Sequence, residues 1–269
     1  MIPVGKIALW VGGAALLVYL VLLALLFWFQ RDFFYPAPKM VVAGPGPGAG
    51  YEDVRIRTAD GLTLSAFYRP ARAGLPTLLF FHGNGSDLEA SVHATRALAA
   101  RGYGVMLPEY RGYGGNPGAP DEQGLYRDGE AAMAWLAAKE VPQGRVVAVG
   151  NSLGSGVATE MAARHRLAGL VLISGFASLD RVAQEHFPVF PVRLLVRDRY
   201  DNLAKFPAVT CPILLLHGTA DDVVSVANSQ ALARAQPAAR FRLVPGAGHE
   251  LAFLATSQSE ILDWLSAGA

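Results

Sequence analysis

A serine flanked by two glycines is the first feature of this sequence that points to chemistry. Gly150-Asn151-Ser152-Leu153-Gly154 follows the apolar run VVAV and precedes a helical stretch, so a sharp strand-to-helix turn is expected there. Glycines two positions before and after the serine let such a turn form without a side-chain collision. The turn lifts the hydroxyl clear of the sheet, beside the N–H groups of a helix N-terminus. Ser152 is therefore the predicted nucleophile, with a chance match in a glycine-rich chain as the alternative.

A serine hydroxyl is too weak an acid to react alone, so it needs a base and a carboxylate that orients the base. His249 is the predicted base, because it lies in GAGHE after the last predicted strand and follows the candidate acids in the chain. A structural histidine is the alternative at that position. The other histidines are assigned to helices, to a proline-rich segment or to strand ends: His93, His165, His186, His82 and His217.

The predicted acid is Asp221, which follows the apolar run PILLLHG at the carboxyl end of a strand. Active sites of open α/β sheets lie at that edge. The neighbouring Asp222 is expected to cap the helix that begins near Ser225, or to face water. The runners-up lie in the segment between the nucleophile and the acid strand: Asp180, Asp198 and Asp201.

The segment FFHGNGSD follows another apolar strand and supplies the fourth element. The backbone N–H of Asn84 is expected to pair with that of Leu153 to bind a developing oxyanion. A phosphate-binding turn is the alternative, but neither a Walker A pattern nor G-x-G-x-x-G is present in this segment.

The elements that must position these residues alternate along the chain. Short apolar runs such as TLLFF, GVMLP and GLVLI are separated by helical stretches, which predicts a mostly parallel, doubly wound α/β sheet covered on both faces. Alternating residues on either side of Asp60-Gly61 predict an antiparallel hairpin at the start of this domain. The catalytic domain is expected to cover residues 51–269.

The N-terminus has a different character. From Ile7 to Phe29 there is no charged residue, and as a helix this segment would be about 35 Å long, enough to cross a bilayer core. Residues 1–30 are therefore predicted to form a single transmembrane anchor, with a cleavable signal peptide as the alternative. Positive charges flank both ends, so the side of the membrane stays open. The glycine- and proline-rich residues 31–50 are predicted to form a linker.

Composition limits the partners. The net charge is +1 and the sequence holds no run of Lys and Arg, so nucleic acid is not expected as a partner. Cys211 is the single cysteine, which excludes an intrachain disulfide and a thiolate metal cluster. The predicted chemistry requires neither a metal nor a cofactor.

In this order, FHGNG, GNSLG, HGTADDVV and GAGHE resemble the α/β-hydrolase superfamily over essentially the whole of the domain. The N-terminal span and a short insertion from Leu179 to about Lys205 look like the membrane-anchored, small-lid branch that includes acyl-protein thioesterase-like and depalmitoylase-like enzymes. The resemblance implies a triad of Ser152, Asp221 and His249, and an oxyanion hole at Asn84 and Leu153. The sequence departs from the commoner pattern at Glu109 and Gly85, both in loops.

The resulting hypothesis is a serine hydrolase that cleaves carboxylic esters or thioesters of acyl substrates through an acyl-enzyme. The insertion at 179–205 is expected to act as a lid with an apolar wall, or alternatively to pack on the sheet edge. Two other functions stay open. One is a serine peptidase or amidase on the same triad, and the other is a catalytically silent scaffold that binds a lipid or a protein at the membrane.

Overall fold

A computed structural model of the protein describes residues 3–37, 48 and 50–268. Within this part of the chain, eight strands form one sheet in the order β1-β2-β4-β3-β5-β6-β7-β8. Pairing is parallel from β4 to β8, whereas β1 and β2 are antiparallel to their neighbours. The strands are β1 (Glu52–Arg57), β2 (Thr63–Arg69), β3 (Thr77–Phe81), β4 (Gly104–Pro108), β5 (Val146–Asn151), β6 (Gly169–Ile173), β7 (Ile213–Gly218) and β8 (Arg240–Val244).

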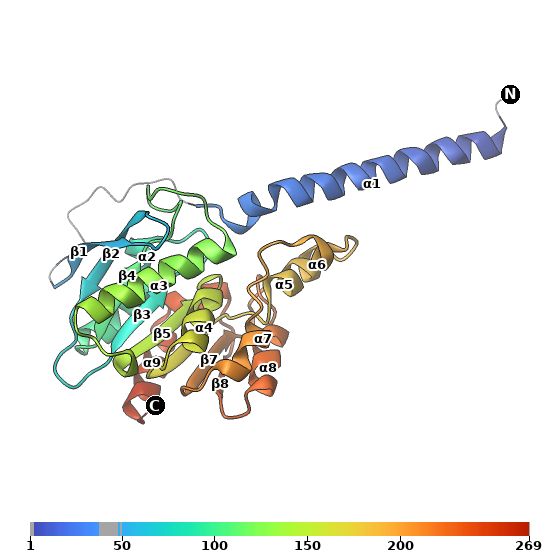
Figure 1. Ribbon diagram of the computed structural model, residues 1–269. Coiled ribbons are helices and arrows are strands. Elements are labelled where there is room, and N and C mark those ends of the chain that lie inside the picture. The colour runs from blue at the N-terminus through green and yellow to red at the C-terminus, as the bar shows by residue number, and fades with distance from the viewer. Residues whose placement is uncertain (1–2, 38–47, 49, 269) are drawn as a thin grey trace.

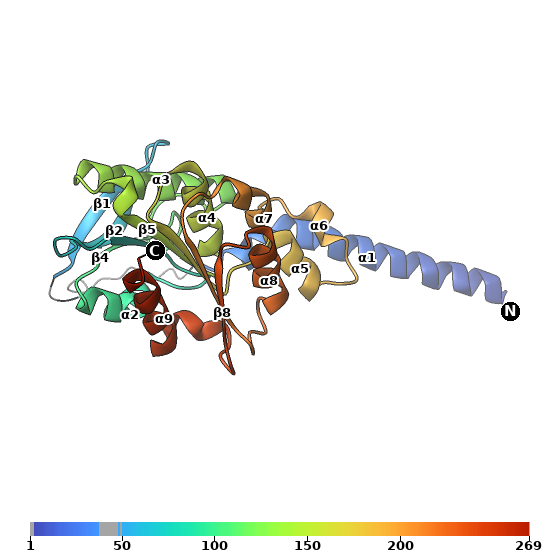
Figure 2. The same cartoon turned by 90° about the horizontal axis from the view of Figure 1, so that it is seen from below.

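Helices cover both faces of this sheet (Figures 1 and 2). Helices α2 and α9 pack on one face, while α3 and α4 pack on the other, and each face has its own cluster of buried apolar side chains. The helices are α1 (Val4–Phe34), α2 (Leu88–Ala100), α3 (Glu122–Ala138), α4 (Gly154–Arg164), α5 (Leu179–His186), α6 (Val192–Leu195), α7 (Asn202–Lys205), α8 (Val226–Ala235) and α9 (Ala255–Ser266). Short 3₁₀ turns occur at Gln143–Arg145, Phe206–Ala208 and His249–Phe253.

Local sequence signals account for several element boundaries. The Asp60-Gly61 turn joins β1 to β2, and Gly61 has a φ of +90°, a conformation that glycine adopts without strain. Asp87 and Asp121 precede α2 and α3, and each carboxylate accepts a hydrogen bond from a backbone N–H of the first helical turn. The predicted α/β fold with an N-terminal hairpin is therefore confirmed.

Helix α1 projects from the domain and lies beside α5 and α6 (Figures 1 and 2). An 18-residue stretch of it has a mean hydropathy of 2.5, and the helix has the length and composition of a membrane-spanning helix or of a signal sequence. The predicted anchor ends at residue 30, whereas the helix continues to Phe34. Most of the predicted linker, residues 38–47 and 49, lies outside the described residues.

The predicted lid, residues 179–205, contains α5, α6 and α7 and lies between β6 and β7. Its loops carry Pro188 and Pro191, which have no N–H to donate and so separate α5 from α6. Leu179 and Val182 of α5 line the same cavity as Ser152, which directly follows the carboxyl end of β5. The insertion therefore stands over that edge of the sheet.

Candidate active site

Ser152 occupies the turn between β5 and α4. Its φ is +50°, a left-handed conformation that is strained for a residue with a side chain. The backbone N–H of Ser152 donates to the carbonyl of Ile173 at 3.0 Å, which ties the turn to the neighbouring strand β6. Strand pairing on one side and the start of α4 on the other thus hold this hydroxyl-bearing residue in its strained position.

The two flanking glycines are required by close packing. A Cβ at Gly150 would lie 2.5 Å from the carbonyl oxygen of Gly154, and a Cβ at Gly154 would lie 2.0 Å from that of Phe81. Both distances are far shorter than a van der Waals contact, and the backbone atoms concerned cannot move aside. The spacing Gly-x-Ser-x-Gly is therefore a packing requirement of this turn.

His249 brings an imidazole to the serine from the other end of the domain. Its Nε2 lies 2.9 Å from Ser152 Oγ, and its Nδ1 lies 2.9 and 3.0 Å from the two carboxylate oxygens of Asp221. With a proton on Nδ1 donated to the carboxylate, the lone pair of Nε2 faces the serine hydroxyl and accepts its hydrogen bond. The structure thus brings together the serine, the histidine and the aspartate that the sequence predicts.

The Asp221 carboxylate is fully buried and held by several donors. It accepts hydrogen bonds from the backbone N–H groups of Val223 at 3.1 Å and Val224 at 2.9 Å, besides that from His249. Burial alone would raise the pKa of Asp221, but the hydrogen bonds from His249 and Val224 outweigh it and lower the pKa to about 2. The group is therefore a carboxylate at neutral pH and can accept the proton that His249 Nδ1 donates.

The other carboxylates considered from the sequence lie elsewhere. Asp222 is exposed and faces water, while Ser225 occupies the N-cap position of α8. The three runners-up in the lid segment have other partners: Asp180 pairs with Arg193 and Arg199, Asp198 with Arg31, and Asp201 caps α7 through the N–H of Ala204.

Asn84 and Leu153, the predicted oxyanion residues, border the same cavity as Ser152 and His249. In the part of the chain that the structure describes, no group accepts a hydrogen bond from the backbone N–H of Asn84 or of Leu153. The Asn84 side chain is held by the hydroxyl of Tyr113, which donates to its Oδ1 at 3.2 Å. Two backbone donors are thus available beside the serine.

Two buried histidines support the loops of the site. His217 is fully buried; one ring nitrogen lies 2.9 Å from the carbonyl of Val224 and the other 2.7 Å from the Ser229 hydroxyl. Burial lowers the pKa of His217, which keeps the ring neutral beside Asp221. The sequence indicated only that His217 ends a strand. It did not indicate that the ring supports the loop that carries Asp221.

His82 supports the loop that carries Asn84. Its Nδ1 donates to the carbonyl of Gly83 at 2.9 Å, and its Nε2 lies 2.7 Å from a carboxylate oxygen of Glu109. Both side chains are about 1% exposed. Glu109, which the sequence showed as a departure in a loop, is therefore the partner of His82 in the core.

The serine opens into a cavity of about 350 Å³, the lower end of the range for small-molecule sites. Apart from Asn84, Ser152, Leu153 and His249, its walls are mainly apolar and come from α1, α5 and the loops after β6 and β7. Phe33 and Phe34 at the end of α1 are part of this lining, although the sequence placed them in a linker. The only signal for them was an aromatic pair directly after the charged Arg31-Asp32.

Among the described residues, no three His, Cys, Asp or Glu side chains are grouped as a metal site would require. The chemistry that the arrangement supports is transfer of a proton from a hydroxyl to an imidazole next to two free backbone donors. Nucleophilic attack on a carbonyl carbon requires these groups: a hydroxyl, a base that takes its proton and donors for the oxyanion.

Known proteins resemble this chain in sequence. Residues 76–194 match the family profile of the α/β-hydrolase fold, and residues 192–253 match that of serine aminopeptidases. An uncharacterised protein of Mycobacterium tuberculosis is 39% identical over 82% of this chain and 80% of its own length. Alpha/beta hydrolase domain-containing protein 17B of Homo sapiens is 34% identical over 72% of this chain and 67% of its own length.

Solved structures share the fold at low sequence identity. An α/β hydrolase of Vibrio vulnificus aligns with a TM-score of 0.74 and 19% identity, over 90% of this chain and 92% of its own. An esterase of Pyrococcus furiosus aligns with a TM-score of 0.68 and 21% identity, over 86% of this chain and 97% of its own. Together with the family profiles, these similarities support a hydrolase. The chain belongs to the α/β-hydrolase superfamily.

Proposed function

We propose that this protein is a serine hydrolase that cleaves carboxylic esters or thioesters of acyl substrates. One observation carries the proposal. Ser152 Oγ, the His249 ring and the Asp221 carboxylate form a continuous line of hydrogen bonds of 2.9 to 3.0 Å. In this proposal Ser152 is the nucleophile, His249 the general base and Asp221 the group that orients the ring.

The first half of the reaction forms an acyl-enzyme. The Ser152 hydroxyl gives its proton to His249 Nε2 as its oxygen forms a bond to the carbonyl carbon of the substrate. The carbonyl oxygen becomes an oxyanion that accepts hydrogen bonds from the N–H groups of Asn84 and Leu153. The carbon–oxygen or carbon–sulfur bond to the leaving group then breaks, and His249 returns the proton to the departing alcohol or thiol.

The second half repeats these steps with water. Water gives a proton to His249 Nε2 and its oxygen attacks the acyl carbon. The bond to Ser152 breaks, and the serine takes the proton back as the carboxylic acid is released. Asp221 stays ionised throughout, which agrees with the pKa of about 2 that its hydrogen bonds produce.

The apolar walls of the 350 Å³ cavity favour an acyl group as the part of the substrate that enters it. The length and hydropathy of α1 support an N-terminal membrane anchor, with residues 51–269 as the catalytic domain. Cleavage of α1 as a signal sequence would remove Phe33 and Phe34 from the wall of the cavity. Retention of the helix is therefore part of the proposal.

The test replaces the nucleophile in the full-length chain. We expect Ser152→Ala to lose at least a thousandfold in kcat/KM on a short p-nitrophenyl ester, and all labelling by a fluorophosphonate probe, while thermal unfolding stays as in the wild type. Ser259→Ala is the matched control, because Ser259 is an exposed serine of α9 and does not line the cavity that contains Ser152. Activity of Ser152→Ala within tenfold of the wild type would refute the proposal.

A second function deserves a direct comparison, because residues 192–253 match the serine aminopeptidase profile. A peptidase or amidase would use the same nucleophile on a poorer leaving group. Ester and anilide substrates with the same acyl part distinguish these two. A catalytically silent scaffold would neither turn over esters nor react with a fluorophosphonate.

A further inference from the structure

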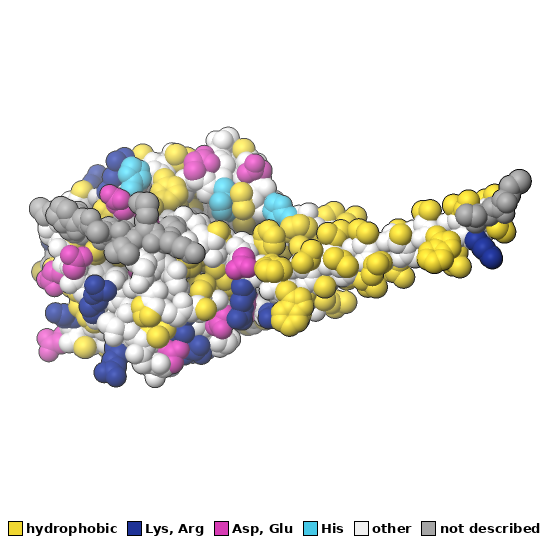
Figure 3. All heavy atoms as spheres, turned by 90° about the horizontal axis from the view of Figure 1, so that it is seen from above, with side chains coloured by type: hydrophobic (Ala, Val, Ile, Leu, Met, Phe, Trp, Pro, Cys, Tyr) yellow, Lys and Arg dark blue, Asp and Glu magenta, His cyan; other side chains and the backbone are white. Residues whose placement is uncertain are grey.

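Helix α1 is longer than a bilayer core requires. Its 31 residues extend over about 46 Å, against a hydrocarbon thickness of about 30 Å. Its side chains are apolar and exposed along most of this length (Figure 3). The last turns therefore continue past the hydrocarbon core and reach the catalytic domain.

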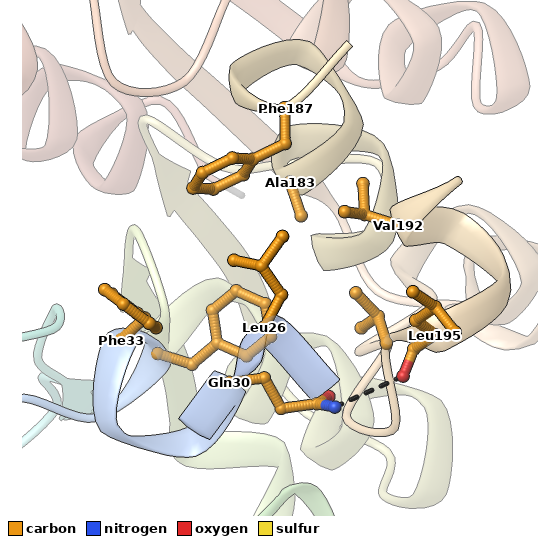
Figure 4. Close-up of a pocket in the computed structure, with 9 residues that line it drawn as sticks. Leu26, Gln30, Phe33, Ala183, Phe187, Val192 and Leu195 are labelled. Carbon is orange, nitrogen blue, oxygen red and sulfur yellow. Dashed lines mark hydrogen bonds between the residues drawn. The ribbon is translucent and has the colours of Figure 1, made fainter. Parts of the chain in front are cut away.

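These last turns are bonded to the lid. Gln30 is only 6% exposed, and its side chain donates to the carbonyl of Leu195 at 3.2 Å (Figure 4). It also accepts from the N–H of Arg197 at 2.8 Å. Arg31 donates two hydrogen bonds to the Asp198 carboxylate, at 2.9 and 3.1 Å. A buried amide and a two-point ion pair fix the position of the lid against the helix.

The tip of the lid reaches further along the helix, towards its N-terminus. The ring of Phe190 stacks on Tyr19 with centroids 5.2 Å apart, and the Tyr19 hydroxyl donates to the carbonyl of Val189 at 3.2 Å. Tyr19 belongs to the uncharged segment that is long enough to span a bilayer. Two further apolar side chains of the lid, Val189 and Leu194, are 73% and 85% exposed. The lid tip therefore lies at the depth of the lipid chains when α1 spans the membrane.

A second, much smaller cavity, of about 40 Å³, lies between α1 and the lid. It is bordered by Leu26 and Gln30 on the helix and by Val192 and Leu195 on the lid (Figure 4). Its surface is almost wholly apolar. Gln30 also lines it, but the polar atoms of this side chain are bonded to the lid. A cavity of this kind accepts hydrocarbon and has no group that would bind a charge.

This cavity adjoins the one that contains the serine. Four residues line both: Phe33 and Phe34 from α1, and Ala183 and Phe187 from α5. Phe187 is 39% exposed, so its ring has room to turn. The side chains that lie between Ser152 and the helix–lid interface are therefore apolar.

We propose that the substrate is an ester or thioester that resides in the bilayer, and that its long acyl chain enters from the leaflet between the end of α1 and the lid to reach Ser152. This inference rests on the proposed function and adds the source and the route of the substrate. A chain that moved through water instead would be disfavoured about fourfold for each methylene. A passage lined by the anchor helix removes that barrier, since the chain stays in apolar surroundings.

The test uses the full-length protein in phosphatidylcholine nanodiscs. The readout is the ratio of kcat/KM for p-nitrophenyl palmitate, dissolved in the bilayer, to kcat/KM for p-nitrophenyl acetate. We expect Leu26→Trp, which fills the helix–lid cavity, to lower this ratio at least tenfold. Leu25→Trp is the matched control, because Leu25 is the adjacent residue but is 48% exposed on the outer face of α1. Its ratio should stay within twofold of the wild type.

A second pair of variants distinguishes a filled cavity from a folding defect in α1. Leu195→Trp fills the same cavity from the lid, and its neighbour Leu194 is 85% exposed and serves as the control. Ratios unchanged in both Leu26→Trp and Leu195→Trp would overturn the lateral route and leave the hydrolase intact. A wild-type protein that neither hydrolyses acetate nor reacts with a fluorophosphonate would instead overturn the proposed function.

Discussion

Replacing Asp221 by asparagine tests the proposed role of the acid with little change in shape. Oδ1 of Asp221 accepts from the N–H groups of Val223 and Val224, so the amide oxygen of an asparagine would stay on these two donors. The amide nitrogen would then face His249 Nδ1 at about the present 2.9 Å. Since two N–H groups cannot bond to each other, the ring proton moves to Nε2, which then presents a donor to Ser152.

That tautomer cannot accept the serine proton. A change of this kind costs on the order of 10³- to 10⁴-fold in rate, equivalent to about 4 to 5.5 kcal/mol of transition-state stabilisation. We expect such a loss in kcat for Asp221→Asn on a short p-nitrophenyl ester, with thermal unfolding measured in parallel to show that the fold is kept.

Asp222→Asn is the matched control, because the neighbouring carboxylate is exposed and faces water. It should retain activity within twofold of the wild type. A loss of less than tenfold in Asp221→Asn, or equal losses in the two variants, would refute the assignment of Asp221 as the orienting acid.

Two further predictions concern stability. The pKa of Asp221 is lowered from 3.8 to about 2 in the folded protein, so its ionised form contributes about 2 kcal/mol that is present above pH 5 and lost as the pH falls towards 2. Urea titrations between pH 5 and pH 2 should show a shallower loss of stability in Asp221→Asn, and identical slopes would contradict this. Gly154→Ala would place a Cβ 2.0 Å from the Phe81 carbonyl oxygen and should destabilise the domain by about 3 kcal/mol or more. Gly144→Ala, where a Cβ meets nothing within 4 Å, should change the unfolding free energy by less than about 1 kcal/mol.

The residues of the candidate site were predictable because each has a local signature. The turn that holds Ser152 needs glycines at two defined positions, and Asp221 and His249 follow apolar strands that are easy to identify. Parallel strands place their carboxyl ends along one edge, so three separate loops converge there without any signal that links them directly. For the same reason the order of the α/β elements and the hairpin at Asp60-Gly61 could be anticipated.

The walls of the site could not be predicted in this way. Phe33 and Phe34 contact the lid from a point about 150 residues earlier in the chain. In a helix that is apolar all round, side chains that face lipid and side chains that face protein have the same composition. Gln30 is the last residue of the predicted anchor, and nothing in the sequence around it indicates the carbonyl of Leu195 as its partner.

The Glu109–His82 pair was missed for a related reason. The sequence showed that an unusual acid follows Pro108, but a side-chain contact across 27 residues depends on how β3 and β4 lie side by side. Parallel pairing of these strands brings their carboxyl ends together, and only then does the acid meet the imidazole. Partners of buried polar groups are a property of the assembled sheet.

The bonds between α1 and the lid have a practical consequence for work with a truncated protein. Removing the first 34 residues would take Arg31 away from the Asp198 carboxylate and Gln30 away from the N–H of Arg197, and it would expose the inner side of Phe187 to solvent. Such a fragment would keep Ser152 but would lack the wall of the cavity that α1 provides. Chain-length preferences measured on such a fragment would therefore differ from those of the chain that carries α1.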